Sequence, residues 1–436
     1  MASEETRTTL PPTVHGPAAL AGPDEPGHDR TRVWAVRLVV LGIVLSAVNL
    51  RPAITSLGAL LEEVRDGLGM SGSVAGLLTS VPPLCFAVFG VMAPRLARRF
   101  GPGAVVCAGM AAITAGLLIR PYAGGTAGFL AASALALMGI AVSNVLMPVI
   151  VKRWFPDRVG SMTGLYSMAL ALGTASAAAI TVPVTDALGG GWQPGLAVWA
   201  ALAAAAVLPW IAFVRQSGAF ASSTPAQAAG DAPHARDEHR GGLRITRSRT
   251  AWALAVFFGL QATAAYITMG WMAQIFRDAG VSAGTAGLLL AVTMVMGVPL
   301  AFVIPRLATR LPHQGPIVLV LGVCGLAGYA GLYFAPAGGA WAWAVLLGIS
   351  NCAFPLALTM VGMRARTGAG VAQLSAFAQS TGYLISIPGP LLVGVLYQHS
   401  GGWGLPIALM TALMIPQILV GLLAGRNRTV EEEAAR

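Results

Sequence analysis

Arg51 is a charged residue about halfway along an apolar segment, residues 38–61, that is long enough to cross a lipid bilayer. Placing a charge at that depth costs at least about 2.5–3.5 kcal/mol, and the side chains one helical turn away, Ala47 and Thr55, cannot neutralise it. A guanidinium binds planar or linear anions through charge-assisted hydrogen bonds. Arg51 is therefore a candidate substrate contact in a central cavity. The alternative is a structural arginine, bonded to backbone carbonyls that Pro52 or a neighbouring helix leaves free.

Amide and phenol side chains occur at similar depth in other apolar segments. Asn144 and Asn351 each stand four residues before a proline, which removes one helix hydrogen bond. These asparagines either satisfy the freed backbone groups and hold helices together, or line the cavity as a pair. A further polar set could bind a small solute or pack helices together, and it consists of Gln261, Tyr266, Gln379 and Tyr383.

The chemistry that the sequence lacks narrows the function. No Asp, Glu or His falls in the middle of a predicted span, so we expect no buried carboxylate relay for protons. A membrane-embedded transferase would need a nucleophile, an acid-base pair or a metal cluster, and the sequence shows no such set. It also lacks the phosphate-binding loop of a nucleotide-driven pump, and Lys152 is its single lysine. We therefore expect no enzyme, no metal and no other cofactor.

These side chains must be positioned by membrane-spanning helices. Of the 436 residues, 56% are hydrophobic and 10% are charged, and the mean hydropathy is +0.72, whereas soluble domains have roughly 25% charged residues. A water-soluble fold is excluded, and the lipid bilayer is the main solvent. The sequence predicts an all-α membrane protein with twelve spans, at about residues 38–61, 74–93, 104–119, 126–151, 161–184, 195–214, 251–276, 286–304, 317–334, 340–363, 371–397 and 405–423.

The basic residues indicate how these spans are oriented. Most lie on one side of the predicted membrane, and the other side holds Arg65, Arg120 and Arg277 beside most of the acids between spans. We therefore expect both termini in the cytoplasm and a monomeric, multi-pass protein of the plasma membrane. The net charge of +10 follows from this topology and needs no nucleic-acid partner. The expected parts are a disordered cytoplasmic N-terminal tail (1–33), a six-helix half (34–215), a flexible cytoplasmic linker (216–250), a second six-helix half (251–425) and a cytoplasmic C-terminal tail (426–436).

The two halves are similar in sequence. Residues 76–78 and 94–99 match residues 287–289 and 305–310 at a constant offset of 211, and the asparagine-proline segments of the fourth and tenth spans repeat at an offset of 207. Duplicated six-helix halves are typical of carriers that rock around a site at the membrane midplane. We therefore predict alternating access around a cavity lined by spans one, four, seven and ten. The duplication argues against the alternative of a receptor or channel.

Three segments point to a family. The most specific is Asn-Leu-Arg-Pro-Ala-Ile-Thr at residues 49–55. The others are Gly259-Leu260-Gln261 with Tyr266 and Trp271 in the seventh span, and Gln373-Leu374-Ser375 with Gln379, Gly382-Tyr383 and Gly389-Pro390 in the eleventh. Together they resemble the major facilitator superfamily, and more specifically its cyanate and nitroimidazole transporter family (CynX/NimT). The resemblance implies a 6+6 major facilitator fold and a secondary transporter, and it adds Asn49 to the substrate-binding candidates.

The same resemblance suggests the solute. It implies a small polar or anionic solute such as cyanate, or alternatively a small neutral heterocycle or drug of the nitroimidazole kind, taken up or exported. The loop after the second span keeps the gating residues of the superfamily at Gly90, Arg95, Arg98 and Arg99. Pro94 stands where the superfamily usually has an aspartate, which weakens the inference of gating by that carboxylate.

Overall fold

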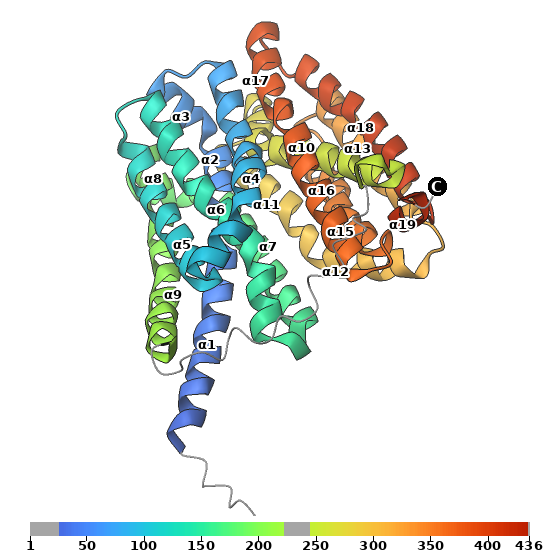
Figure 1. The fold of residues 1–436 in the computed structure, drawn as a ribbon. Coiled ribbons are helices and arrows are strands. Elements are labelled where there is room, and N and C mark those ends of the chain that lie inside the picture. Colours follow the sequence, from blue (N-terminus) through green and yellow to red (C-terminus); the bar gives the residue numbers. More distant parts are fainter. Residues whose placement is uncertain (1–25, 222–244, 435–436) are drawn as a thin grey trace, which may run out of the picture.

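Apolar helices form almost the whole of the computed structural model, which describes residues 26–221 and 245–434 (Figure 1). Among these residues, twelve helical segments are long and apolar enough to cross a membrane, which confirms the predicted spans. Spans two and eight continue to Phe100 and Arg310, beyond their predicted ends, because arginine side chains in a last turn can extend to the membrane surface. Most of the expected N-terminal tail and of the linker lies outside the described residues.

The N-terminal half contains spans one to six. Its helices are α1 (Pro26–Asn49), α2 (Pro52–Ala59), α3 (Leu61–Leu68), α4 (Gly72–Phe100), α5 (Pro102–Ile119), α6 (Thr126–Trp154), α7 (Val159–Ala187), α8 (Trp192–Ala197) and α9 (Trp199–Ala221), with the 3-10 turns η1 (Arg120–Tyr122) and η2 (Pro156–Arg158). The C-terminal half contains spans seven to twelve. It comprises η4 (Ile245–Arg247), α10 (Arg249–Asp278), α11 (Ala283–Val295), α12 (Gly297–Arg310), α13 (Gly315–Phe334), α14 (Ala340–Asn351), α15 (Ala353–Met363), α16 (Gly368–Ser386), α17 (Pro388–Ser400), α18 (Gly404–Ala424) and α19 (Val430–Ala434).

Several spans are interrupted near their middles. Span one breaks at Arg51, whose φ of −124° and ψ of −27° are not helical, because a residue that precedes a proline is disfavoured in the α conformation. Spans eight, ten and eleven are interrupted at Met296, Cys352 and Ile387. Irregular backbone at membrane depth is tolerated where it is buried in protein or lines a cavity. The breaks therefore mark the depth at which a site is expected.

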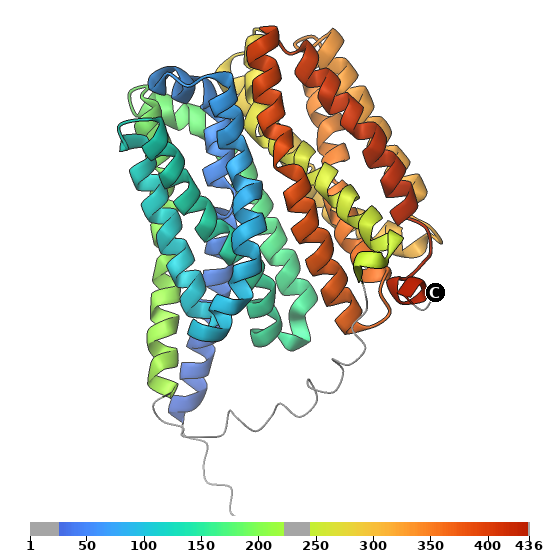
Figure 2. The same cartoon turned by 45° about the horizontal axis from the view of Figure 1, so that its top comes forward.

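The two halves stand side by side, and they meet mainly toward one end of the bundle (Figure 2). We call the end where α1 begins and α9 ends the terminal face, and the other end the opposite face. Span eight shows the asymmetry, because α11, its opposite-face part, packs extensively on α7, whereas α12 does not. A Cβ atom on Gly394 of α17 would lie 2.3 Å from the Gly72 carbonyl oxygen of α4, so the two helices approach as closely as only glycine permits. The bundle is closed at the opposite face.

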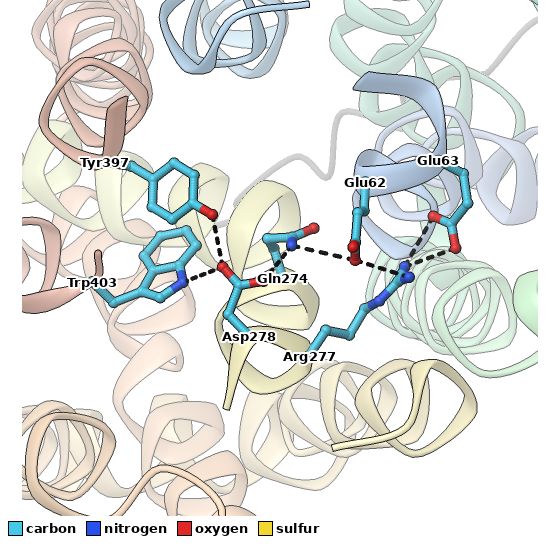
Figure 3. A network of polar contacts seen from close by, with 7 residues as sticks. All are labelled: Glu62, Glu63, Gln274, Arg277, Asp278, Tyr397 and Trp403. Carbon is cyan, nitrogen blue, oxygen red and sulfur yellow. Dashed lines mark hydrogen bonds and ion pairs between the residues drawn. The ribbon is translucent and has the colours of Figure 1, made fainter. Parts of the chain in front are cut away.

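Ion pairs join the halves at the closed end (Figure 3). Arg277, at the end of α10, lies 2.9 Å from a carboxylate oxygen of Glu62 and 2.9 Å from one of Glu63, both in α3. All three side chains are partly exposed, so each pair contributes only about 0–1 kcal/mol. The pairs help to hold α3 of the N-terminal half against α10 of the C-terminal half.

Asp278 extends this network within the C-terminal half. Its carboxylate accepts hydrogen bonds from the hydroxyl of Tyr397 and the indole nitrogen of Trp403, each at 2.8 Å, and from the amide of Gln274 at 2.7 Å (Figure 3). These contacts tie α10 to α17 and to the start of α18. The end of α10 is therefore fixed on both sides.

The C-terminal segment docks on its own half. In α19, Glu433 accepts hydrogen bonds from the Ser248 hydroxyl at 2.6 Å and from the Thr250 backbone amide at 3.0 Å. Burial alone would raise the pKa of Glu433, but these hydrogen bonds to the charged form outweigh it and hold the pKa below its ordinary value. Within the described part of the expected tail, residues 426–434, α19 is thus held against the first turn of α10 by hydrogen bonds.

Candidate substrate-binding cavity

A cavity of about 390 Å³ lies between the two halves, and it is lined by spans one, five, seven, eight and ten. Thr293, Met294 and Gly348 line it on one side of the helix breaks, and Ala301, Pro305 and Thr359 on the other. The cavity therefore spans the depth of the breaks and extends toward the terminal face. Most of its lining is apolar. Its polar lining residues are Arg51, Ser167, Thr174, Gln261, Thr293, Asn351 and Thr359.

Arg51 supplies the charge of this cavity. The break between α1 and α2 places its half-buried side chain at the cavity wall, with the guanidinium carbon 5.8 Å from the centre of the Phe86 ring. The phenols of Tyr166, Tyr266 and Tyr383 lie near it. Within the described residues no carboxylate pairs with Arg51. A fixed cation therefore faces the space between the halves.

An aromatic layer lies beside Arg51. Phe86 stacks on Tyr383 with ring centres 5.1 Å apart, and it lies 6.5 Å from Tyr266. Phe258 packs edge-on against Tyr383 at 5.2 Å. Tyr266 and Tyr383 are buried and do not line the cavity, so these two predicted contacts adjoin Arg51 without facing the open space.

Two of the predicted amides meet in the cavity wall. The Gln261 amide nitrogen donates to the Asn351 backbone carbonyl at 2.9 Å and approaches its side-chain oxygen at 3.4 Å. Gln417 of α18 donates to the Gln261 oxygen at 3.1 Å. Both Gln261 and Asn351 line the cavity, because the break after α14 turns Asn351 toward α10. Together with Arg51 they give the cavity hydrogen-bonding groups from both halves.

Two other candidates use their amides elsewhere. Asn49 is buried and donates to the carbonyls of Leu45 at 2.7 Å and Leu202 at 3.1 Å, which fastens α1 to α9. Gln379 donates to the Ser375 hydroxyl at 2.7 Å, one turn back in α16. Neither residue lines the cavity.

Span four does not contribute to the cavity in the way that the sequence predicts. Asn144 accepts a hydrogen bond of 2.5 Å from the Tyr166 hydroxyl, and no residue of α6 is among those that line the cavity. Spans one, seven and ten line this cavity, and span four does not.

Span five contains lining residues that sequence reasoning missed. Ser167, Leu170, Ala171 and Thr174 all line the cavity, and their spacing of three and four residues places them on one face of a helix. The sequence signal that could have found them is the repetition of small and hydroxyl side chains on one face of an apolar helix. Thr293 of span eight gave no periodic signal of this kind.

The predicted gating residues lie in the second half of α4. Arg95, Arg98 and Arg99 are exposed toward the terminal face, and Arg95 donates to the Val91 carbonyl at 3.2 Å. A Cβ atom added to Gly90 would lie 3.7 Å from the nearest side chain, which is that of Val145. In the described parts of the chain none of these arginines forms an ion pair.

The groups that line the cavity are suited to binding a solute. Its polar groups are one guanidinium, two amides and several hydroxyls, which donate and accept hydrogen bonds without a proton donor or acceptor of the acid-base kind. Nowhere in residues 26–221 and 245–434 do three or more His, Cys, Asp or Glu side chains gather as a possible metal site. The arrangement can hold a small polar or anionic solute between two halves of a bundle.

Sequence comparison decides the family. Residues 39–370 match the profile of the Major Facilitator Superfamily. The chain belongs to this superfamily. It is therefore a multi-pass secondary transporter, and its six-helix halves are those of the major facilitator fold.

Curated relatives of this transporter cover nearly its full length. It is 34% identical to the uncharacterized transporter YycB of Bacillus subtilis over 90% of its own chain and 94% of that protein. It is 32% identical to the 2-nitroimidazole transporter of Escherichia coli, over 90% and 96% of the two chains, and 29% identical to the cyanate transport protein CynX of the same organism, over 86% and 95%. A crystal structure of a variant of the nucleoside transporter NupG superposes with a TM-score of 0.70 at 12% identity, over 90% and 99% of the chains, and shows the shared fold.

Proposed function

We propose that this transporter moves a small anion of the cyanate kind across the plasma membrane by alternating access, with Arg51 as its charged contact. The observation behind the proposal is the Arg51 guanidinium at the cavity wall, without an ion-pair partner among the described residues. A cation at this depth is costly, and an anionic solute would supply the missing charge through charge-assisted hydrogen bonds. The Asn351 side-chain amide, held in place by Gln261, would bind the other end of the solute.

The proposed cycle uses the asymmetry between the two ends of the bundle. The opposite face is closed by the ion pairs of Arg277 and by glycine contacts, while the cavity extends from the depth of the helix breaks toward the terminal face. The excess of basic residues predicts that the terminal face is cytoplasmic, so this arrangement would be the inward-facing one. Rocking of the halves about the depth of Arg51 would expose the same residues to the outside.

A neutral heterocycle of the nitroimidazole kind is the second candidate. Two features of the cavity favour it, namely a volume of about 390 Å³, much larger than a three-atom anion, and a lining that includes Met269, Met294 and Phe354. A planar ring would bury apolar surface there, while Arg51 donated hydrogen bonds to an acceptor group. The similarity to the 2-nitroimidazole transporter of E. coli supports this candidate as well.

Uptake into proteoliposomes under an imposed membrane potential separates the two candidates. A potential of about 100 mV, positive inside, favours accumulation of a monovalent anion by ~2.3 kcal/mol and leaves a neutral solute unaffected. Cyanate that crosses as the bare anion should enter faster under this potential than without it, and 2-nitroimidazole should compete for its entry. Protein-free liposomes are the control. Uptake of the azole alone, at a rate independent of potential, would replace the anion proposal by the second candidate.

A further inference from the structure

The buried arginine Arg120 has unused hydrogen-bonding capacity. Arg120 forms the turn η1 after span three and is only 2% exposed. One terminal nitrogen of its guanidinium donates to the Ala53 carbonyl at 2.9 Å, and the other lies 3.4 Å from the Ser56 hydroxyl. Its Nε atom is buried and has no partner among the described residues.

Arg120 borders a small cavity. This cavity has a volume of about 20 Å³, above the roughly 10–15 Å³ that one water molecule needs. Ser133 of α6 also lines it, and its buried hydroxyl likewise lacks a partner within the described chain. Two residues that each have an unsatisfied buried donor, one of them charged, thus line the same space, whereas buried polar groups are normally hydrogen-bonded.

The charge balance of this space favours an anion over water. Within the described residues no carboxylate pairs with Arg120, and a buried charge without a counter-charge is strongly destabilising. Water could satisfy Nε and the Ser133 hydroxyl, but it would leave the positive charge unbalanced. We propose that the cavity binds one halide ion, chloride under ordinary conditions, as the counter-ion of Arg120.

The proposed halide site differs from the Arg51 cavity in place and in size. Tyr266 lines the small cavity and also interacts with Arg51, so it stands between the two sites. The space admits a single atom or a water molecule and excludes larger organic anions. The inference does not depend on which solute Arg51 binds.

Both halves of the transporter build this site. Arg120, Ser133 and Gly58 belong to the N-terminal half, whereas Tyr266 and Gly270 belong to α10. A Cβ atom on Gly58 would lie 2.0 Å from the Met269 carbonyl oxygen, so the halves touch at the rim of the cavity. The complete site exists while the opposite face is closed, and a bound halide should therefore favour that state over the open one.

Thermal unfolding of the purified full-length transporter in detergent tests the proposal. At constant ionic strength, replacing sodium gluconate by sodium chloride or bromide should give a saturable rise in Tm of about 2 °C or more, since a ligand that binds only the folded state stabilises it. Equal Tm values in all three salts would overturn the proposal. So would a crystal structure in bromide with water and no anomalous peak beside Arg120.

Three variants assign the effect to this cavity. Ser133→Asp supplies a carboxylate within the site and should remove the response of Tm to chloride, because Arg120 then has a counter-ion. Ser133→Ala, a milder change, should raise the half-saturating chloride concentration severalfold. Arg51→Gln should keep the full response. A response lost in Arg51→Gln but kept in both Ser133 variants would place the halide in the large cavity and contradict the proposal.

Discussion

At the scale of single residues, Arg51 links the sequence to the cavity most directly. The cost of a charge inside an apolar segment makes it conspicuous from the sequence alone, and the structure adds the reason for its orientation. Pro52 breaks the helix at Arg51, so its side chain leaves the helix between two segments and reaches the space between the halves. Pro52 thus both interrupts span one and directs the Arg51 side chain toward the cavity.

Two substitutions of Arg51 should separate the effect of its charge on transport from the effect of its hydrogen bonds. For an anionic solute we expect Arg51→Gln to lower the transport rate by about 10- to 100-fold, since a hydrogen bond to a charged group is worth roughly 1.5–3 kcal/mol. Arg51→Lys should keep a small fraction, because lysine preserves the charge without the planar fork. Initial uptake rates in proteoliposomes measure both variants, and Arg426→Gln, at an exposed arginine of the terminal face, is the matched control. Normal transport by Arg51→Gln would make Arg51 structural.

The other candidate residues show where sequence reasoning stops. Gln261 and Asn351 line the cavity and contact each other, whereas Asn49 donates to carbonyls of α1 and α9 and does not line it. All three are polar residues in apolar helices. The sequence around each of them gives no sign of which ones line the cavity. The face that a helix turns toward the cavity depends on which helices pack beside it, and that is a property of the assembled bundle.

At the scale of elements, the number and approximate limits of the spans follow from physics that acts locally. Apolar runs of about 20 residues must be helical in lipid because every backbone group needs an internal partner. The same reasoning did not predict α19, which is short and acidic, because Glu431 and Glu433 are stabilised by contacts with residues 60 or more positions away. Such docking has no local pattern in the sequence.

The docking of α19 should make stability depend on pH. Because hydrogen bonds lower the pKa of Glu433 in the folded protein, its contribution is complete above the ordinary glutamate pKa of about 4.3 and is lost as the pH falls through the lower folded value. We expect Glu433→Gln to lower Tm at pH 7 by an amount that corresponds to about 1 kcal/mol, and the difference should shrink toward pH 4. Thermal unfolding at both pH values measures it. Glu432→Gln, at an exposed ion pair with Arg366, should have a smaller effect.

Arg277 should stabilise the closed opposite face. Arg277→Gln removes two partly exposed ion pairs, and since each is worth about 0.2–1 kcal/mol, opening at that end should become about two- to thirtyfold more frequent. A cysteine at Leu61, buried between the halves, reports opening by its labelling rate with a membrane-impermeant maleimide, in a background without the four native cysteines. Asp186→Asn, an exposed acid of the same face, should leave the rate unchanged. Equal rates in both variants would show that the glycine contacts close this end unaided.

At the scale of the whole molecule, the internal repeat predicts two halves with a site between them, but not which end is closed. Both ends carry the helix termini of a repeated unit, and the same chain must close each end in turn during a transport cycle. The observed state follows from contacts between residues far apart in sequence, such as Gly394 with Gly72 and Arg277 with Glu63. Each of these contacts is individually weak, which is what reversible closure requires.

The distribution of carboxylates over the whole molecule predicts how transport is energised. Among the described residues no Asp, Glu or His lines the large cavity, and Glu62 and Glu63 lie at the closed opposite face instead. We therefore expect uniport, exchange, or uptake of the solute together with its own proton, and no proton carried by a side chain at mid-depth.

Exchange of labelled for unlabelled solute across proteoliposomes, with and without a pH gradient, tests this expectation. A rate that does not respond to the gradient indicates uniport or exchange of the ion itself. A rate that responds equally in the wild type and in a Glu62→Gln, Glu63→Gln double variant indicates that the proton travels with the solute. If the response vanishes in the double variant, coupling runs through the carboxylates of the opposite face. Opening of that end would then involve protonation of these carboxylates. The expectation of transport without a titrating side chain would be wrong.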